Sequence, residues 1–452
     1  MVEGRGRFNS RIGIILATAG SAVGLGNIWR FPYMTGQNGG AAFILLYIGC
    51  TILLGIPGMV AEFVVGRYSA SNAATAYRKI SKSRYWSAVG YLGVLTSMII
   101  LGFYAVVAGW CLQYLFASMA GRLQGDAAYV SHYFEQFSTD AVVPTIWTIV
   151  FILLTHMVVT RGVRRGIERV SKILMPMLLL LLAIIVVASC SLPGAGKGIA
   201  FLLRPDFSKI DRGILLDALG QSFFSLSLGT ACLCTYASYF TRKTNLLRSA
   251  VSIAGLDSFI AIMAGLMIFP AAYSVGVSPD SGPSLIFITL PNVFQQAFSA
   301  IPGLGYVISI LFYALLSLAA LTSTISMHEI GTALFYEELH LRRSQGAWIE
   351  TILCCVIGIF CSLSMGAVEG LTIGGMSVLD FCDRLTAQFL LPIGALLTFL
   401  LLGWIVSKQV VYDEFTNKGT TNRTFFALWM FSVRVICPAC ILAIFLHQLG
   451  VL

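Results

Sequence analysis

Long apolar segments, separated by short polar ones, run along the whole chain. Most of them are long enough to cross the hydrocarbon core of a bilayer, which takes about 20 residues of helix. The pattern predicts eleven spans, at residues 11–37, 41–70, 86–120, 144–160, 166–191, 214–241, 246–275, 303–336, 347–366, 373–405 and 425–449. We therefore expect an all-α polytopic membrane protein.

The first span is interrupted by small and polar residues. Gly20, Gly24 and Gly26 surround Asn27, and Arg30 follows. Glycine weakens a helix, and an amide or a guanidinium at membrane depth is costly without a partner. A break frees backbone groups that lipid cannot satisfy, so they must line a cavity in which carbonyls attract cations and amides attract anions. The alternative is that these glycines only allow close helix packing.

The sixth span carries a second interruption. Ser225, Ser227, Gly229 and Thr230 cluster at its middle. Two broken helices, each opening a set of five spans, fit an inverted repeat with a binding site at the midplane, whereas a single serine-rich segment is more often a packing face. The sequence predicts a five-plus-five inverted repeat whose first half is residues 1–192 and second half residues 193–405, with residues 406–452 and the eleventh helix outside it.

Composition and charge agree with a membrane location. The chain is 57% hydrophobic and only 11% charged, with a net charge of +9. Its basic residues gather on alternate loops, which is the positive-inside pattern and argues against a nucleic-acid partner. We expect a cytoplasmic N-terminus, an external C-terminus and insertion in the plasma (inner) membrane. The 11 cysteines lie mostly within spans, where they are best interpreted as small apolar residues.

Several polar side chains within the other spans need partners. Glu62 is interpreted as a cap for the broken first helix, with a proton carrier as the alternative. The hydroxyl of Tyr104 could meet a substrate carboxylate. Asp257 is predicted to be an ion ligand, rather than a proton-switching or structural acid. Thr322 and Ser323 could donate to their own helix or, near the breaks, offer oxygen to a hard cation.

Five motifs, in order along the chain, resemble those of the neurotransmitter:sodium symporter family, which transports amino acids and amines and includes the bacterial leucine transporter. They are GSAVGLGNIWRFPY at residues 20–33, NGGAAF at 38–43, GQSFFSLSLG at 220–229, TYASY at 235–239 and ALTST at 320–324. The resemblance extends from Arg11 to about Phe445.

The resemblance implies two sodium ions and one amino acid bound between the breaks. The first sodium would be held by Ala22, Asn27, Ser225 and Asp257. The second would be held by Gly20, Val23, Ala319, Thr322 and Ser323. The substrate would contact Ala22, Gly24, Gly26, Ile100, Tyr104, Phe224, Ser225, Ser227, Thr230, Ser323 and Met327.

The resemblance also implies gates. Arg30 and Asp383 would form the outer gate, with Gln221 nearby, although Asp383 alone could equally be a solvated acid at a helix start. Arg5 and Glu337 are the candidates for an inner ion pair, and Arg7 and Glu338 are equally well placed.

Two departures from the family pattern shape the functional prediction. Chloride-dependent animal members have Asn at the position of Asp257, so a fixed carboxylate here predicts independence from chloride. Thr230 replaces a bulkier aromatic residue and no charged group lines the pocket, which favours a neutral, hydrophobic or aromatic L-amino acid.

The expected function is therefore sodium-coupled symport by alternating access, with the amino acid and the bilayer as partners and a homodimer as an open alternative. A proton-coupled transporter, or a sensor or channel of the same fold, are rival hypotheses. A membrane enzyme is disfavoured because His156, His328 and His447 have no glycine-flanked serine that suggests a catalytic pair.

Overall fold

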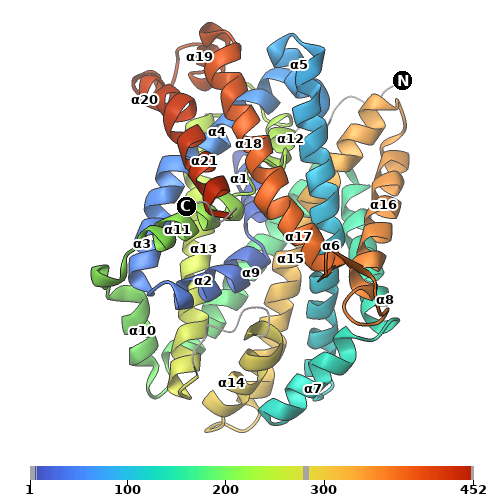
Figure 1. Ribbon diagram of the computed structural model, residues 1–452, viewed down its shortest axis with the longest axis vertical. Helices are drawn as coiled ribbons and strands as arrows, with labels where there is room; N and C mark the ends of the chain where they lie inside the picture. The colour runs from blue at the N-terminus through green and yellow to red at the C-terminus, as the bar shows by residue number, and fades with distance from the viewer. Residues whose placement is uncertain (1–5, 7, 278–284, 449–452) are drawn as a thin grey trace.

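The computed structural model describes residues 6, 8–277 and 285–448 and is almost entirely helical (Figure 1). Eight continuous helices are long and apolar enough to cross a membrane, and two bent helix pairs raise that number to ten. The two halves of the predicted sixth span add an interrupted eleventh. Within the described residues the structure therefore confirms an all-α polytopic architecture.

The first five predicted spans lie within the part of the chain that holds the first nine α-helices. Five of these helices are continuous with a π-helical or 3₁₀ turn. The elements are α1 (Arg11–Ala22), η1 (Gly26–Arg30), α2 (Phe31–Gln37), α3 (Ala41–Cys50), η2 (Thr51–Gly55), α4 (Ile56–Ser69), α5 (Ala73–Ser81), η3 (Arg84–Trp86), α6 (Ser87–Met119), α7 (Ala127–Ser138), α8 (Val143–Val159), η4 (Val163–Glu168) and α9 (Arg169–Cys190). Of these, α5 and α7 are short helices between spans that the hydropathy pattern did not predict.

The second half of the chain begins with a short helix and the interrupted sixth span. The elements are α10 (Ala195–Leu203), η5 (Phe207–Lys209), α11 (Arg212–Ser225), α12 (Cys232–Ala237), α13 (Leu246–Ser274), η6 (Leu285–Thr289), α14 (Leu290–Ala297), α15 (Leu304–Glu338) and α16 (Arg343–Leu363). The segment between α13 and α15 contains η6 and α14, and its residues 278–284 lie outside the described part.

The last spans follow a two-stranded antiparallel turn in which Thr372 pairs with Ser377. The elements are β1 (Thr372–Ile373), β2 (Met376–Ser377), α17 (Val378–Leu385), η7 (Thr386–Leu390), α18 (Leu391–Leu400), η8 (Leu401–Ile405), α19 (Lys408–Phe415), η9 (Arg423–Phe425), α20 (Phe426–Phe431), η10 (Ser432–Ile436) and α21 (Cys437–Gln448).

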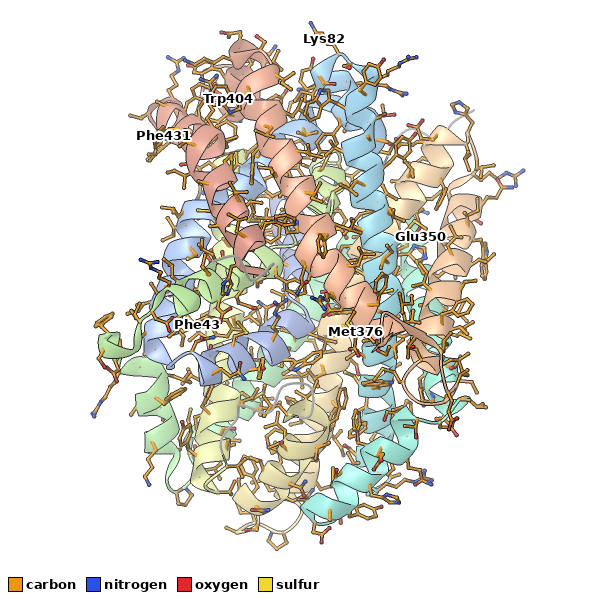
Figure 2. All side chains as sticks on the ribbon, in the orientation of Figure 1. Phe43, Lys82, Glu350, Met376, Trp404 and Phe431 are labelled. Atoms are coloured by element: carbon orange, nitrogen blue, oxygen red, sulfur yellow. The ribbon has the colours of Figure 1, made fainter. Side chains whose placement is uncertain are left out.

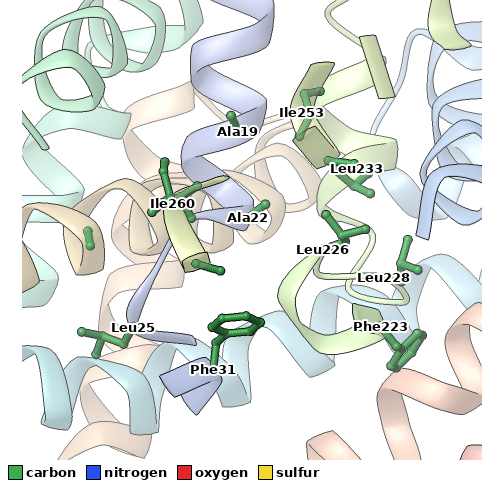
Figure 3. Packing of buried hydrophobic residues seen from close by; sticks show 14 of the residues in the cluster. Ala19, Ala22, Leu25, Phe31, Phe223, Leu226, Leu228, Leu233, Ile253 and Ile260 are labelled. Carbon is green, nitrogen blue, oxygen red and sulfur yellow. The ribbon is translucent and has the colours of Figure 1, made fainter. Parts of the chain in front are cut away.

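Helix α15 occupies a central place among the spans, since it packs against α1, α6, α8, α9 and α16. Helix α13 packs against α1, α4 and α9. Figure 3 shows apolar side chains from both breaks, among them Leu25 and Leu226, which belong to the same buried cluster as Ile260 of α13. The core of the protein therefore surrounds the two interruptions.

Lys82 lies at the end of the molecule where α5 and α19 are found (Figure 2). Trp404 and Phe431 lie on the outer surface towards the same end, with exposed fractions of 66% and 53%. Aromatic residues of this kind are typical of the interface between lipid and water.

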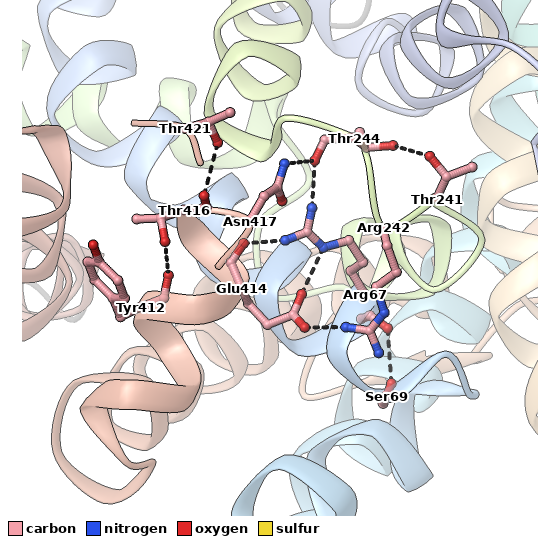
Figure 4. Close-up of polar contacts among 11 residues, drawn as sticks. Arg67, Ser69, Thr241, Arg242, Thr244, Tyr412, Glu414, Thr416, Asn417 and Thr421 are labelled. Carbon is pink, nitrogen blue, oxygen red and sulfur yellow. Dashed lines mark hydrogen bonds and ion pairs between the residues drawn. The ribbon is translucent and has the colours of Figure 1, made fainter. Parts of the chain in front are cut away.

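An ion cluster around the buried pair Arg67 and Glu414 joins three segments at this end (Figure 4). The carboxylate of Glu414 on α19 accepts a 2.8 Å hydrogen bond from Nε of Arg67 and a further one from Arg242. Arg67 also donates to the carbonyl of Thr244. The cluster joins the end of α4, the segment between α12 and α13, and α19.

Candidate functional site

The first break is a bend of 57° between α1 and the helix that resumes at Gly26. Helix α1 ends at Ala22. A Cβ at Gly24 would lie 2.5 Å from Ser323 Oγ and 2.7 Å from the Tyr104 hydroxyl, so any larger residue there would displace these two side chains. Gly26 faces the ring of Phe224, at 3.5 Å from such a Cβ. The backbone of the break is thus pressed against side chains of α6, α11 and α15.

The second break spans residues 226–231, between α11 and α12. Its backbone is left-handed at Ser227 (φ 53°), Gly229 (φ 85°) and Ala231 (φ 59°). Gly229 is required for two reasons. Its left-handed backbone favours glycine, and a Cβ there would collide with the carbonyl of Leu391 on α18. The helix interruption predicted from Ser225, Ser227, Gly229 and Thr230 is therefore present.

Glu62 caps this second break. Its Oε1 accepts a 2.7 Å hydrogen bond from the backbone amide of Gly229, and its side chain is buried. The sequence correctly suggested a capping carboxylate but assigned it to the wrong helix. Glu62 lies on α4, which packs against α12, and this contact brings it to the sixth span instead of the first.

Asn27, Ser225 and Asp257 join the two breaks to α13. Asn27 Nδ2 donates to Asp257 Oδ1 at 2.7 Å and to Ser225 Oγ at 3.2 Å, while its Oδ1 accepts from the Gly24 amide. Ser225 Oγ donates to Asp257 Oδ2 at 2.8 Å. All three side chains are buried. These residues, with Ala22 at the end of α1, are the four that were predicted for the first sodium.

Tyr47 belongs to the same cluster and was missed by the sequence analysis. Its hydroxyl donates to Asp257 Oδ2 at 3.0 Å, and its side chain is fully buried on α3, in the first half of the second span. Asp257 therefore accepts hydrogen bonds from three side chains, which offsets part of the cost of burying a carboxylate. A tyrosine within an apolar span was the signal that singled out Tyr104, and it applies equally to Tyr47.

The residues predicted for the second sodium meet between the end of α1 and the middle of α15. Ser323 Oγ donates to the Val23 carbonyl at 3.1 Å, and Thr322 Oγ1 donates to the carbonyls of Ala319 and Val23. A Cβ on Gly20 would lie 3.3 Å from Thr322 Cβ. Carbonyl and hydroxyl oxygens are the donors that small hard cations prefer, so this set fits sodium.

Neither oxygen set is a conventional transition-metal site. Within the described ranges, no three His, Cys, Asp or Glu side chains are grouped so as to hold a metal ion. The chemistry available is that of carbonyls, hydroxyls and one buried carboxylate.

The predicted substrate residues surround the first break. The amide of Leu25 donates to the Tyr104 hydroxyl at 2.9 Å, which puts that hydroxyl beside the amides expected to receive a carboxylate. Ser227 Oγ lies 3.4 Å from the Ser21 carbonyl. Ile100 is buried on α6, and the partly buried Met327 lies on α15, which packs against α6.

Thr230 has a structural role in the second break. Its hydroxyl donates to the Ser227 carbonyl at 2.7 Å and accepts from the Cys232 amide at 3.1 Å. Its carbonyl accepts from Ser97 Oγ. Because the only proton of this hydroxyl is donated to the backbone, the Thr230 side chain cannot donate a hydrogen bond to a ligand in this arrangement.

Arg30, Gln221 and Asp383, the predicted outer-gate residues, line one cavity of about 430 Å³. The Arg30 guanidinium lies over the Phe224 ring, at 4.4 Å from its centroid. Within the described residues Arg30 and Asp383 line the same cavity but do not form an ion pair. Arg5 of the predicted inner pair lies outside the described residues, and Glu337 accepts a 2.7 Å hydrogen bond from the Asn72 amide.

Comparisons with known proteins agree with this geometry. The model of the sodium:neurotransmitter symporter family matches residues 5–141 and 138–452. The chain is 39% identical to an uncharacterized sodium-dependent transporter, YhdH, of Bacillus subtilis, covering 98% of this chain and 97% of the relative. It is 26% identical to the human sodium- and chloride-dependent GABA transporter 2, over 91% of this chain and 74% of that protein.

One solved structure has the same fold. The crystal structure of MhsT in complex with L-phenylalanine matches with a TM-score of 0.88 and 42% identity, covering 98% of this chain and 100% of that one. The resemblance found in the five sequence motifs is thereby confirmed, and so is the fold class, with its broken first and sixth helices. The chain belongs to the sodium:neurotransmitter symporter family.

Proposed function

We propose that this sodium-dependent transporter carries a neutral, hydrophobic or aromatic L-amino acid into the cell together with sodium, without chloride. The observation that carries the proposal is the meeting of Asn27, Ser225 and Asp257 beside the freed amides near Gly24. This arrangement brings oxygen atoms that suit a cation next to backbone N–H groups released from the helix. Those N–H groups donate to Asn27 and Tyr104 here, and a substrate carboxylate would engage them when bound.

The two predicted sodium ions would have different roles. The first would touch the substrate carboxylate directly, so each ligand would raise the affinity of the other, and that coupling is reciprocal. The second would join α1 to α15 through Val23, Thr322 and Ser323. Its loss would free the inner half of the first helix and favour inward opening by alternating access.

The preference for an apolar side chain rests on the pocket lining. Ile100, Phe224 and Met327 contribute apolar surface, and the Thr230 hydroxyl is occupied by backbone. The relative MhsT was crystallised with L-phenylalanine, which fits an aromatic substrate for this chain as well. Apolar pockets discriminate by only about 1–3 kcal/mol per methylene, so we expect several related amino acids to compete.

Asp257 is the basis for independence from chloride. Its carboxylate lies beside the place predicted for the first cation. It would supply there the negative charge that a bound chloride would otherwise supply.

The proposal also includes a plasma-membrane location, with the N-terminus cytoplasmic and the C-terminus external. It includes repeats at residues 1–192 and 193–405, and no enzymatic activity.

Uptake into proteoliposomes tests the proposal. With an inward sodium gradient, labelled L-phenylalanine should accumulate, and replacing chloride by gluconate should leave the rate unchanged. An inside-negative potential should increase accumulation, since it contributes about 2.3 kcal/mol per charge per 100 mV. Uptake driven by a proton gradient in sodium-free buffer would favour the proton-coupled alternative instead.

A further inference from the structure

A second polar cavity, of about 300 Å³, lies at the starts of α1 and α13, and none of the predicted outer-gate residues lines it. Arg11, Lys243 and Arg248 line it together with Phe8, Asn9, Ser10, Ile14, Thr241, Thr244, Asn245 and Ser249. Figure 4 shows Thr241 and Thr244 of its wall in the loop that leads from α12 to α13.

The charge of this cavity is unbalanced. All three basic side chains are exposed, and none of them forms an ion pair with a described acidic residue. No acidic residue is among those that line the cavity. By contrast, the nearby Arg242 is bound to Glu414. Three unpaired cations around one hollow favour an anionic ligand.

Two helices begin at this cavity, and the second of them adds to its positive potential. Ser10 caps α1 by accepting from the Gly13 amide, and Asn245 caps the 29-residue α13 by accepting from the Arg248 amide. At the start of α1 the carboxylate of Glu168, which is paired with Lys172, accepts hydrogen bonds from the Asn9 amide and the Ser10 hydroxyl. No carboxylate among the lining residues meets the start of α13, so the positive end of that helix dipole faces the cavity. The start of α13 adds to the potential of the three side chains and does not define the site on its own.

The surroundings distinguish a lipid from a soluble anion. Ile12, next to Arg11, is 66% exposed, and Val251, three residues after Arg248, is 50% exposed. In a chain that spans a membrane these apolar side chains face acyl chains. The basic cavity therefore opens at the level where headgroups lie and continues onto a lipid-facing surface, a combination typical of anionic-lipid sites between spans.

We propose that this cavity binds the phosphodiester headgroup of an anionic phospholipid, held by Arg11, Lys243 and Arg248. The bound headgroup bridges the start of α1, which carries Gly20 and Ala22, and the start of α13, which carries Asp257. An anionic lipid at this place supports the alignment of the two helices that supply the predicted cation ligands.

Native mass spectrometry of the purified full chain tests the assignment, with phosphatidylglycerol and phosphatidylcholine as the added lipids. The wild type should retain phosphatidylglycerol in preference to phosphatidylcholine. The triple variant Arg11→Gln, Lys243→Gln, Arg248→Gln should bind phosphatidylglycerol at least about tenfold more weakly. The reason is that each basic residue near a membrane surface contributes to the attraction of an anionic lipid, and the variant loses all three contributions. Arg248→Gln alone should show a smaller loss, and it keeps the test valid if the triple variant is unstable.

A matched triple variant separates a built site from general basic charge. Lys82, Arg84 and Lys408 are exposed basic residues outside the cavity, and changing all three to Gln removes the same charge. The control should retain phosphatidylglycerol as the wild type does. Equal losses in both triple variants, or no loss in either, would overturn the proposal. Displacement of the lipid by an equal concentration of glycerol 3-phosphate would overturn the assignment to a lipid.

Discussion

Asp257 carries the only side-chain charge in the oxygen cluster that joins the two breaks. Its carboxylate accepts from Asn27, Ser225 and Tyr47, all buried. A buried carboxylate stabilises a neighbouring sodium strongly, because the local dielectric screens little. The chloride independence that we propose depends on this one side chain.

The substitution Asp257→Asn should therefore weaken sodium-dependent amino-acid binding by at least about tenfold, which corresponds to roughly 1.4 kcal/mol. The loss should be smaller in chloride than in gluconate, because a halide can supply part of the missing negative charge. Binding titrations of labelled L-phenylalanine in the two salts measure both effects. The exposed helix cap Asp126→Asn serves as the control. A variant with unchanged sodium affinity would remove Asp257 from the ion site.

Gly24 provides a test of the substrate position. A Cβ at this residue would occupy the place between Ser323 Oγ and the Tyr104 hydroxyl. Gly24→Ala should abolish detectable amino-acid binding while the protein still folds, as judged by gel filtration. Gly49→Ala is the matched control, since a Cβ there meets nothing within 4 Å and Gly49 faces outward from the second span. Normal binding by Gly24→Ala would place the substrate elsewhere.

At the scale of single residues, the sequence predicted the site residues that are unusual within an apolar span and missed one that is not. Asn27, Asp257 and Thr322 stood out because polar groups are costly inside apolar spans. Tyr47 carries the same signal more weakly, because a tyrosine also serves as an ordinary apolar core residue. Its partner Asp257 is 210 positions away in the chain. No local pattern reveals a contact of that separation.

At the scale of elements, the two breaks are held open by side chains from other helices. Glu62 of α4 satisfies the Gly229 amide, and Tyr104 of α6 satisfies the Leu25 amide. Freed backbone groups in a membrane need such partners. The glycines and serines were enough to predict where the breaks occur. The capping residue of each break could not be predicted in this way, because it depends on how the helices pack.

Glu62→Ala should destabilise the protein, because the buried Gly229 amide loses its acceptor at a cost of about 1–3 kcal/mol. The melting temperature in detergent measures the loss. Glu62→Gln keeps a carbonyl oxygen at the same place and should lower the melting temperature less. Equal melting temperatures for the wild type and Glu62→Ala would show that the cap contributes nothing.

The short helices outside the spans were not predicted. α7 begins with Asp126, whose side chain accepts from the Tyr129 amide, and α5 begins with Asn72 in the same way. Both capping residues can be recognised in the sequence. A hydropathy analysis searches for long apolar segments, however, and these helices are short. The capping residues between the spans were therefore not used to predict helices.

At the scale of the whole molecule, the cluster around Glu414 connects segments that belong to different parts of the chain. Arg67 is almost fully buried, and Glu414 provides its only carboxylate among the described residues. Removing one partner of a buried pair leaves an uncompensated charge. The cluster therefore fixes the loop that leads from α12 into α13.

Glu414→Ala should cost about 3–5 kcal/mol of stability, the range typical of breaking a buried ion pair. Thermal unfolding monitored by intrinsic fluorescence detects the change. The neighbouring Asp413→Ala is the control, because the Asp413 side chain bonds only to Gln409 within the described residues. Similar unfolding temperatures for both variants would contradict a structural role for the cluster.

The central claim is that two interrupted helices hold sodium ions and an amino acid together. Equilibrium binding of labelled L-phenylalanine to the purified protein, in sodium and then in potassium, tests it most directly. The account predicts saturable binding in sodium, at least about tenfold weaker binding in potassium, and loss of the sodium-dependent part in Asn27→Ala and Thr322→Ala. Equal affinity in both cations, unaffected by these two substitutions, would contradict it.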